Sequence, residues 1–270
     1  MTATLADYRA HRELLTHLTL RELRSKYKRS FFGWAWSLVT PLVNMVVYTI
    51  VFSYFLKAQI QPGEPSGLNV FALYLMCGML PFNYLNASVM GSIGSVIGGS
   101  SLIKKTYFPR ELLPAATVIS NLVTHLIEMG LLLVALLAFG NWRAIPYLPI
   151  TLILILLTTI FGLGLGLALS VLNVYFRDIQ YLMTIVFVVW FFLTPIVYSL
   201  ASLTHVSGAV KDLLKLNPMT DAVLSFRATL YDGTHPGWLE FSYFAVVAIG
   251  CYFIGRAIFN RFEGRLAEEL

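Results

Sequence analysis

The sequence predicts an all-α integral membrane protein with six transmembrane helices, and its composition and the length of its apolar runs indicate this. Of the 270 residues, 57% are hydrophobic and only 12% are charged, whereas soluble domains contain about 45–50% apolar and about 25% charged residues. A helix of about 20 apolar residues crosses the hydrocarbon of a bilayer. The formal net charge is +5, but most of this chain could not form the solvated basic face that nucleic acid requires, so we expect no nucleic-acid partner.

Six apolar runs are long enough to span a membrane. They cover 34–56, 68–98, 113–139, 146–172, 180–198 and 239–259. An even number of spans puts both termini on one side, where 14 Lys and Arg gather in the termini and loops, against 5 on the other side. Because Lys and Arg concentrate on the cytoplasmic side, we expect both termini there. The chain then divides into a cytoplasmic segment 1–33, a membrane domain 34–259 and a tail 260–270.

The sequence lacks the common signatures of nucleotide and metal chemistry. A phosphate-binding loop needs the pattern GxxxxGK[ST], and the dipeptide Gly-Lys does not occur in this chain. The five histidines are scattered, and Cys77 and Cys251 form no CxxC motif, so neither a metal site nor a disulfide framework is indicated. We therefore expect a chain that is not an enzyme and carries no cofactor of its own.

Small and polar residues recur at helical spacing in two predicted spans. Gly162, Gly166 and Ser170 lie four residues apart, a spacing that lets helix backbones approach closely. In the third span a polar stripe occupies one helix face, and intramembrane ionisable groups face partners, water or substrate. The stripe fits a hydrogen-bonded cluster between helices or subunits, a substrate path or a proton relay; its members are Asn121, Thr124, His125 and Glu128.

The stretch "LRELRSKYKRSFFGWAW", residues 20–36, concentrates cations immediately before the first predicted span. Leu14, Leu15 and Leu18 form an apolar side of the preceding helix, opposite cations that begin at Arg21. Basic amphipathic helices of this kind lie in the headgroup plane of a membrane. From the residues alone, the segment is equally a topology anchor.

Five passages together resemble the membrane subunits of polysaccharide-exporting ABC transporters of the ABC-2 type. The basic segment leads into a G-x-x-W-x-x-x-x-P pattern at Gly33, Trp36 and Pro41. The further passages follow in the order found in that family. They are "IKKTYFPRELLP" (103–114), "LNVYFRDIQYL" (172–182), "LTPIVYS" (193–199) and "LNPMT" (216–220).

The resemblance implies a homodimer that pairs with two copies of a separate ATP-binding subunit, which binds the ATP and Mg. It implies an interface helix at 14–29 and a coupling helix at 102–111, where charged and aromatic side chains suit docking to that partner. It also implies short outer gate helices between spans five and six, at 210–216 and 221–231. The implied coupling residues are Lys104, Lys105, Tyr107, Phe108, Arg110 and Glu111.

The cargo of such subunits is a polysaccharide on a polyprenyl-pyrophosphate or related lipid, such as O-antigen, teichoic acid, galactan or capsule. Cations at the membrane surface, Arg24, Lys28 and Arg29, are candidate contacts for the pyrophosphate, which guanidinium groups bind bidentately. Aromatic side chains offer flat faces to sugars, although aromatic belts and ordinary packing also explain them. The candidate channel lining is Phe52, Tyr54, Phe55, Phe82, Tyr84, Trp190, Phe191 and Phe192.

Three other functions compete with polysaccharide export across the cytoplasmic membrane. A drug or small-lipid exporter would share the same architecture. A membrane enzyme acting on polyprenyl phosphates would need paired acidic residues at a cytoplasmic face, where only the isolated Glu111 and Asp178 occur. A proton-coupled transporter centred on Glu128 would need no ATP-binding partner.

Overall fold

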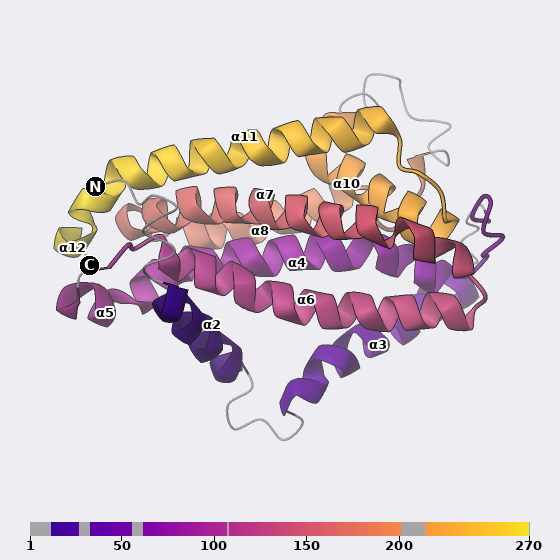
Figure 1. Ribbon diagram of the computed structural model, residues 1–270, viewed down its shortest axis with the longest axis horizontal. Coiled ribbons are helices and arrows are strands. Elements are labelled where there is room, and N and C mark those ends of the chain that lie inside the picture. Colours follow the sequence, from indigo (N-terminus) through magenta and orange to yellow (C-terminus); the bar gives the residue numbers. More distant parts are fainter. Residues whose placement is uncertain (1–11, 27–32, 56–61, 107, 201–213, 270) are drawn as a thin grey trace.

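The computed structural model describes residues 12–26, 33–55, 62–106, 108–200 and 214–269. These residues form an elongated helical bundle that is 85% helix and contains no strand. Five helices run along the long axis of the bundle (Figure 1). They are α4 (Phe71–Gly98), α6 (Leu112–Ala138), α7 (Leu148–Tyr175), α8 (Ile179–Leu193) and α11 (Trp238–Phe262).

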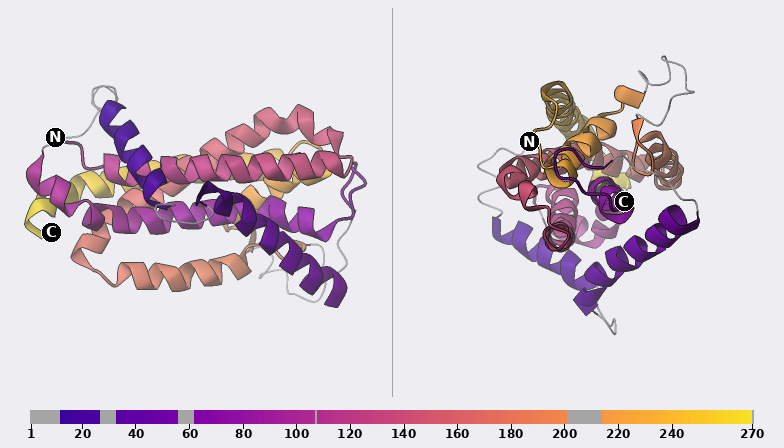
Figure 2. Two further views of the ribbon diagram at one scale, coloured as in Figure 1. Left: turned by 90° about the horizontal axis from the view of Figure 1, so that it is seen from below. Right: turned by 90° about the vertical axis from the view of Figure 1, so that its right-hand side faces the viewer.

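Two further helices lie obliquely on one side of the bundle. Helix α2 (Arg12–Lys26) and helix α3 (Trp36–Tyr48) form a V in the view along the long axis (Figure 2). The short elements connect or extend the long helices. They are η1 (Gly33–Ala35), η2 (Thr49–Phe55), α5 (Ser100–Lys105), η3 (Trp142–Tyr147), α10 (Pro218–Arg227), η5 (Ala228–Asp232), η6 (Glu263–Arg265) and α12 (Leu266–Glu269).

Among the described residues, three helices are both long and apolar enough to cross a membrane: 112–138, 142–175 and 238–262. The segments 39–51 and 179–193 are apolar but shorter. Helix α8 ends at Leu193, earlier than the predicted limit at 198, because a turn begins at Thr194 and Pro195 has no N–H to continue a helix. These helices make the chain a multi-pass membrane protein.

The two ends of the bundle are built differently. At the α5 end, α2, α5 and α12 meet the ends of α4, α7 and α11 around a buried cluster that includes Leu18, Ile103, Phe259 and Leu266. At the α10 end, the segment before α4 and the elements η3, α10 and η5 close the bundle. There the Asn141 amide donates to the carbonyl oxygens of Leu230 (2.7 Å) and Tyr231 (3.0 Å).

Glycines bring α7 into close contact with its neighbours, as the four-residue spacing predicts. A Cβ on Gly166 would lie 2.8 Å from the side chain of Ser92 on α4. On the other side of α7, a Cβ on Gly164 would lie 2.6 Å from the backbone nitrogen of Tyr252 on α11, where Gly255 faces it. Only residues without a side chain permit this approach.

Asn217 attaches α10 to the end of α8. Its side-chain oxygen caps α10 by accepting from the Met219 N–H (3.0 Å) and also accepts from the Trp190 indole N–H (2.7 Å). Its amide donates to the Thr194 hydroxyl (3.0 Å). The passages "LTPIVYS" and "LNPMT", distant in the sequence, therefore meet at this point.

Arg227 is a buried cation that joins three elements at the α10 end. Its side chain is 3% exposed and donates to the carbonyl oxygens of Pro195 (2.5 Å) and Ile196 (2.5 Å). The guanidinium also lies 3.7 Å from the ring centroid of Tyr74 on α4. Burial lowers the pKa of Arg227, and the carbonyl dipoles and the aromatic face compensate for the lost hydration.

Replacing Arg227 with Met should destabilise the α10 end, because the Pro195 and Ile196 carbonyls lose their buried donors. We expect the free energy of unfolding to fall by about 3 kcal/mol, measured by thermal or chemical unfolding in detergent. The free energy of unfolding of Arg227→Lys should lie between those of the wild type and Arg227→Met, since a single ammonium cannot donate to both carbonyl oxygens as the guanidinium does. Lys215→Met is the control at an exposed cation of the same end, and equal effects of the Arg227 and Lys215 changes would refute the assignment.

Candidate functional site

A lateral groove of about 590 Å³ lies between α3, α4 and α8. Its wall combines aromatic rings with amide and hydroxyl groups. Both kinds of group suit a sugar, which presents apolar C–H faces and hydroxyls. The lining residues are Tyr48, Phe82, Asn83, Asn86, Ala87, Met90, Thr184, Phe187, Val188, Phe191 and Phe192.

Phe82 organises the aromatic wall of the groove. It is 2% exposed, and its ring lies edge-on to Phe191 at 5.5 Å and to Phe187 at 6.1 Å between centroids. Edge-to-face pairs of this kind hold rings in fixed orientations. Phe192, by contrast, is 66% exposed at the groove edge.

Four other aromatic candidates for a channel lining are not among the lining residues of this groove: Tyr54, Phe55, Tyr84 and Trp190. Tyr84 is 3% exposed and stacks on His125 with ring centroids 4.6 Å apart, inside the bundle. Trp190 is half-buried, and its indole N–H donates a hydrogen bond to the side-chain oxygen of Asn217. Tyr54 and Phe55 are exposed at the end of η2 and pack edge-to-face. The side chain of Phe52 lies outside the described part of the chain.

Lys26 of α2 forms hydrogen bonds with the polar stripe on α6. The Lys26 ammonium donates to the side-chain oxygens of Asn121 (2.5 Å) and Thr124 (3.4 Å). Desolvation lowers the pKa of Lys26, while the negative charges of Glu128 and Glu22 act in the opposite direction. The Asn121 amide also donates to the Ala87 carbonyl oxygen of α4 (3.1 Å). The stripe thus connects α2, α6 and α4.

Glu128, the deepest member of the stripe, lines a crevice of about 140 Å³ between α3, α4 and α6. The remaining lining is apolar, with Pro41 and Met45 from α3 and Met76 and Leu80 from α4 among its residues. This crevice is distinct from the lateral groove, because the two cavities share no lining residue. His125 is buried beneath Tyr84 and does not line either cavity.

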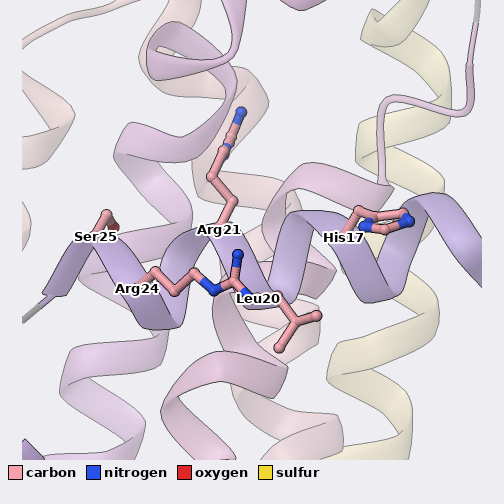
Figure 3. Close-up of a pocket in the computed structure, with 5 residues that line it drawn as sticks. All are labelled: His17, Leu20, Arg21, Arg24 and Ser25. Atoms are coloured by element: carbon pink, nitrogen blue, oxygen red, sulfur yellow. The ribbon is translucent and has the colours of Figure 1, made fainter. Parts of the chain in front are cut away.

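The outward side of α2 carries a second, basic groove of about 600 Å³ (Figure 3). It is lined by His17, Leu20, Arg21, Arg24 and Ser25. The opposite side of α2 buries Leu18 and Leu23 against the bundle, so the helix is amphipathic as the sequence predicts. The candidate headgroup residue Arg24 is exposed in this groove, whereas Lys28 and Arg29 lie outside the described residues.

The predicted coupling segment divides into exposed and buried residues. Lys104 and Lys105 are exposed at the end of α5. Phe108 is 4% exposed and belongs to the buried cluster of the α5 end. Within this chain it is therefore a core residue, and Tyr107 lies outside the described residues.

The charged residues that follow hold the segment against the end of α11. Arg110 donates to the carbonyl oxygen of Glu263. Glu111 is 1% exposed and forms an ion pair with Arg256 at 3.5 Å. Arg110 and Glu111 therefore fix the position of the loop, and the exposed cations are those of α5. In the part of the chain that the structure describes, no group of three or more His, Cys, Asp or Glu side chains could hold a metal ion.

Sequence reasoning missed the polar residues that hold the site in place. Lys26 looked like one cation in a basic run, and Asn217 and Arg227 like ordinary residues of an outer segment. The isolated cation of the apolar stretch "DAVLSFRATLY" was the available signal for Arg227, because a charge among apolar residues needs a partner. The groove residues Asn83 and Asn86 carried a similar signal in an otherwise apolar span.

Comparison with known proteins gives one consistent result. Residues 13–231 match the family described as ABC-2 type transporter. The O-antigen export system permease protein RfbA of Myxococcus xanthus is 30% identical over 96% of both chains. The protein of the same name from Klebsiella pneumoniae is 28% identical over 96% of this chain and 95% of its own. The polysialic acid transport protein KpsM of Escherichia coli is 23% identical over 91% and 92%, respectively.

Replacing Lys26 with Met should loosen α2 from the bundle, because Asn121 and Thr124 lose a charge-assisted donor. We expect hydrogen exchange of the α2 amides to become roughly tenfold faster, measured by mass spectrometry on the purified protein. Arg21→Met is the matched control, since Arg21 is exposed on the same helix and pairs with its neighbour Glu22. Unchanged exchange in the Lys26 variant would show that apolar contacts alone hold α2.

Proposed function

Because the chain belongs to the ABC-2 type transporter family, we propose that it is the membrane subunit of an ATP-driven exporter of lipid-linked polysaccharide. The groove between α3, α4 and α8 is the observation that carries this proposal. It offers aromatic faces and neutral polar groups along the side of the bundle, which suits a sugar chain. Relatives named for O-antigen export and polysialic acid transport support the same class of cargo.

In this proposal the chain works as a homodimer, and the grooves of two copies face each other to form the channel. The exposed side of α8 supports a partner there, since Leu182, Ile185, Val189 and Leu193 are each half or more exposed. Phe82, Phe191 and Phe192 line the channel directly, with Tyr54 and Phe55 toward the α10 end. Tyr84 and Trp190 do not line the channel and instead support its wall from inside the bundle. Tyr84 stacks on His125, and Trp190 donates a hydrogen bond to Asn217.

We further propose six spans, with α3 and η2, α4 and α8 completing the three long apolar helices. The α5 end is then cytoplasmic, because the Lys and Arg of the terminal segments and of α5 gather on that side. The protein resides in the cytoplasmic membrane, and α10 and η5 lie at the outer side as gate elements. The separate partner subunit binds ATP and Mg, and this chain contributes no cofactor.

Motion reaches the channel through the α5 end in this scheme. Two copies of an ATP-binding subunit dock on the exposed Lys104 and Lys105 and on α2. The contacts of Arg110 and Glu111 with the end of α11 hold the loop rigidly, so that a movement of the loop also moves α11. Phe108 strengthens the loop from inside, by packing in the buried cluster.

Two alternatives fit the residues less well. A drug or small-lipid exporter would need a pocket of limited size, and the crevice of that size beside Glu128 holds only about 140 Å³. Proton-coupled transport through Glu128 would need a polar path, whereas Glu128 faces apolar side chains and the charge of Lys26. Copurification with an ATP-binding subunit separates ATP-driven export from proton coupling. Reduced assembly in Glu128→Gln, with unchanged transport by the complexes that still form, would make Glu128 a contact residue.

Reversing two charges on α5 tests the docking site. The double variant Lys104→Glu with Lys105→Glu should reduce the amount of ATP-binding subunit that copurifies with this chain at least several-fold, since like charges across an interface repel. The matched control reverses Arg143 and Lys215, two exposed cations at the α10 end. Full retention of the partner by the α5 variant would refute docking at these lysines.

Neutralising two of the candidate headgroup cations tests headgroup binding. Arg24→Gln combined with Arg29→Gln should lower cargo-stimulated ATP hydrolysis about tenfold, because a pyrophosphate loses charge-assisted hydrogen bonds. Assembly with the ATP-binding subunit should persist, as measured by copurification. Arg12→Gln is the control, because Arg12 is exposed on the same helix and does not line the groove. If assembly fails first, the segment is an anchor for the complex.

A further inference from the structure

We propose that the lateral groove selects an uncharged sugar polymer, and that Asn83 and Asn86 are its specificity-determining contacts. This inference rests on the proposed function, because it assumes that the groove between α3, α4 and α8 is the path of the cargo. It goes further by stating the chemical class of polymer that the path accepts.

The helices that form the walls of the groove carry no charged side chain. The helices α3, η2, α4 and α8 contain no Asp, Glu, Lys or Arg. Two charged groups of the neighbouring helices α2 and α6 are not among the lining residues of the groove. Lys26 is bound to Asn121 and Thr124 on α6, and Glu128 lines the separate crevice between α3, α4 and α6.

A polyanion would meet a large electrostatic cost in such a groove. Moving a carboxylate or a phosphate out of water costs several kcal/mol per ion in proteins, unless a fixed counter-charge or several donors compensate. A chain with an anion on every sugar would incur that cost repeatedly along the walls. A neutral sugar needs only hydrogen-bond partners for its hydroxyls, which is a much smaller requirement.

The amide groups of two asparagines in the groove are free of hydrogen bonds to the described residues. Asn83 is exposed and Asn86 half-buried on one face of α4, and both line the groove. Neither side chain forms a hydrogen bond with another residue that the structure describes. By contrast, Asn173 donates to the Ile93 carbonyl oxygen (3.2 Å) and Asn141 to two carbonyl oxygens.

Amides on the groove wall that have no partner among the described residues are available to a polar ligand in the groove. Each amide offers two donors and one acceptor, which match hydroxyl, ring-oxygen and acetamido groups of neutral sugars. Across the groove, the Thr184 hydroxyl donates to the Gln180 carbonyl oxygen (2.9 Å) and leaves only its acceptor capacity. The rings of Phe187 and Phe191 complete the site with apolar faces.

The test uses the full chain assembled with its ATP-binding subunit in inverted membrane vesicles. The probes are a lipid-linked polymannose, which is neutral, and a lipid-linked polysialic acid, which carries a carboxylate on every sugar. We measure the translocated fraction of each polymer. The wild type should move the neutral polymer at least tenfold faster than the polyanion.

Two sets of variants locate the selectivity. Asn83→Ala with Asn86→Ala should slow the neutral polymer about tenfold, the effect of losing two hydrogen bonds. Asn83→Lys with Asn86→Lys should shift the preference toward polysialic acid, a gain that a misfolded protein cannot produce. Asn69→Ala is the matched control, because Asn69 is exposed just before α4 and lies outside the groove.

The outcomes separate this inference from the function on which it rests. Equal transport of both polymers by the wild type, or a preference for polysialic acid, overturns the inference and leaves polysaccharide export standing. An unchanged preference in the lysine variant, in a protein that still assembles and transports, also overturns it. Failure to move either polymer contradicts the proposed function, and the inference falls with it.

Discussion

Polar groups at the junctions between helices of an apolar bundle are stabilised by partners within the chain, because hydrocarbon offers none. This constraint fixes the architecture at several levels. Arg227 satisfies it with two carbonyls and an aromatic face, and so joins α10 to α8 and α4. Asn217 satisfies it with Trp190 and Thr194 at the same junction. Lys26 satisfies it at the α5 side, by reaching the polar stripe of α6.

The two ends of the bundle consequently hold their elements in different ways. At the α10 end, neutral carbonyl and amide groups surround one cation, so the elements there are held by directional hydrogen bonds. At the α5 end, an apolar cluster around Ile103, Phe108 and Phe259 is bordered by the Glu111–Arg256 ion pair. Exposed cations lie beyond that border, among them Arg24 on α2, Lys104 and Lys105 on α5 and Arg261 at the end of α11. The end that carries them is the one suited to a partner in water and to anionic headgroups.

The sequence predicted the helical class and the approximate limits of the long helices, because apolar runs and glycine spacing are local signals. It could not predict that α8 would end at Leu193, where a proline turn becomes the acceptor for Arg227. Nor could it separate Phe82 and Phe191, which line the groove, from Tyr84, which is stacked inside the bundle. Aromatic residues look alike in a sequence, and their roles depend on which helix faces which. The same holds for Phe108, whose place in the core depends on contacts with distant segments.

The approach of Gly164 to the backbone of α11 has a mechanical consequence. Two helices in backbone contact resist sliding and separation, because any shift forces carbonyls and Cα atoms together. Helices α7 and α11 therefore form a rigid pair within the bundle. By contrast, Phe187 is the only buried residue of α8, and Pro41 the only one known to be buried in α3. Within a single chain, the more easily displaced wall is thus the one that borders the groove, so widening the groove requires displacement of two weakly embedded helices and leaves the rest of the bundle undeformed.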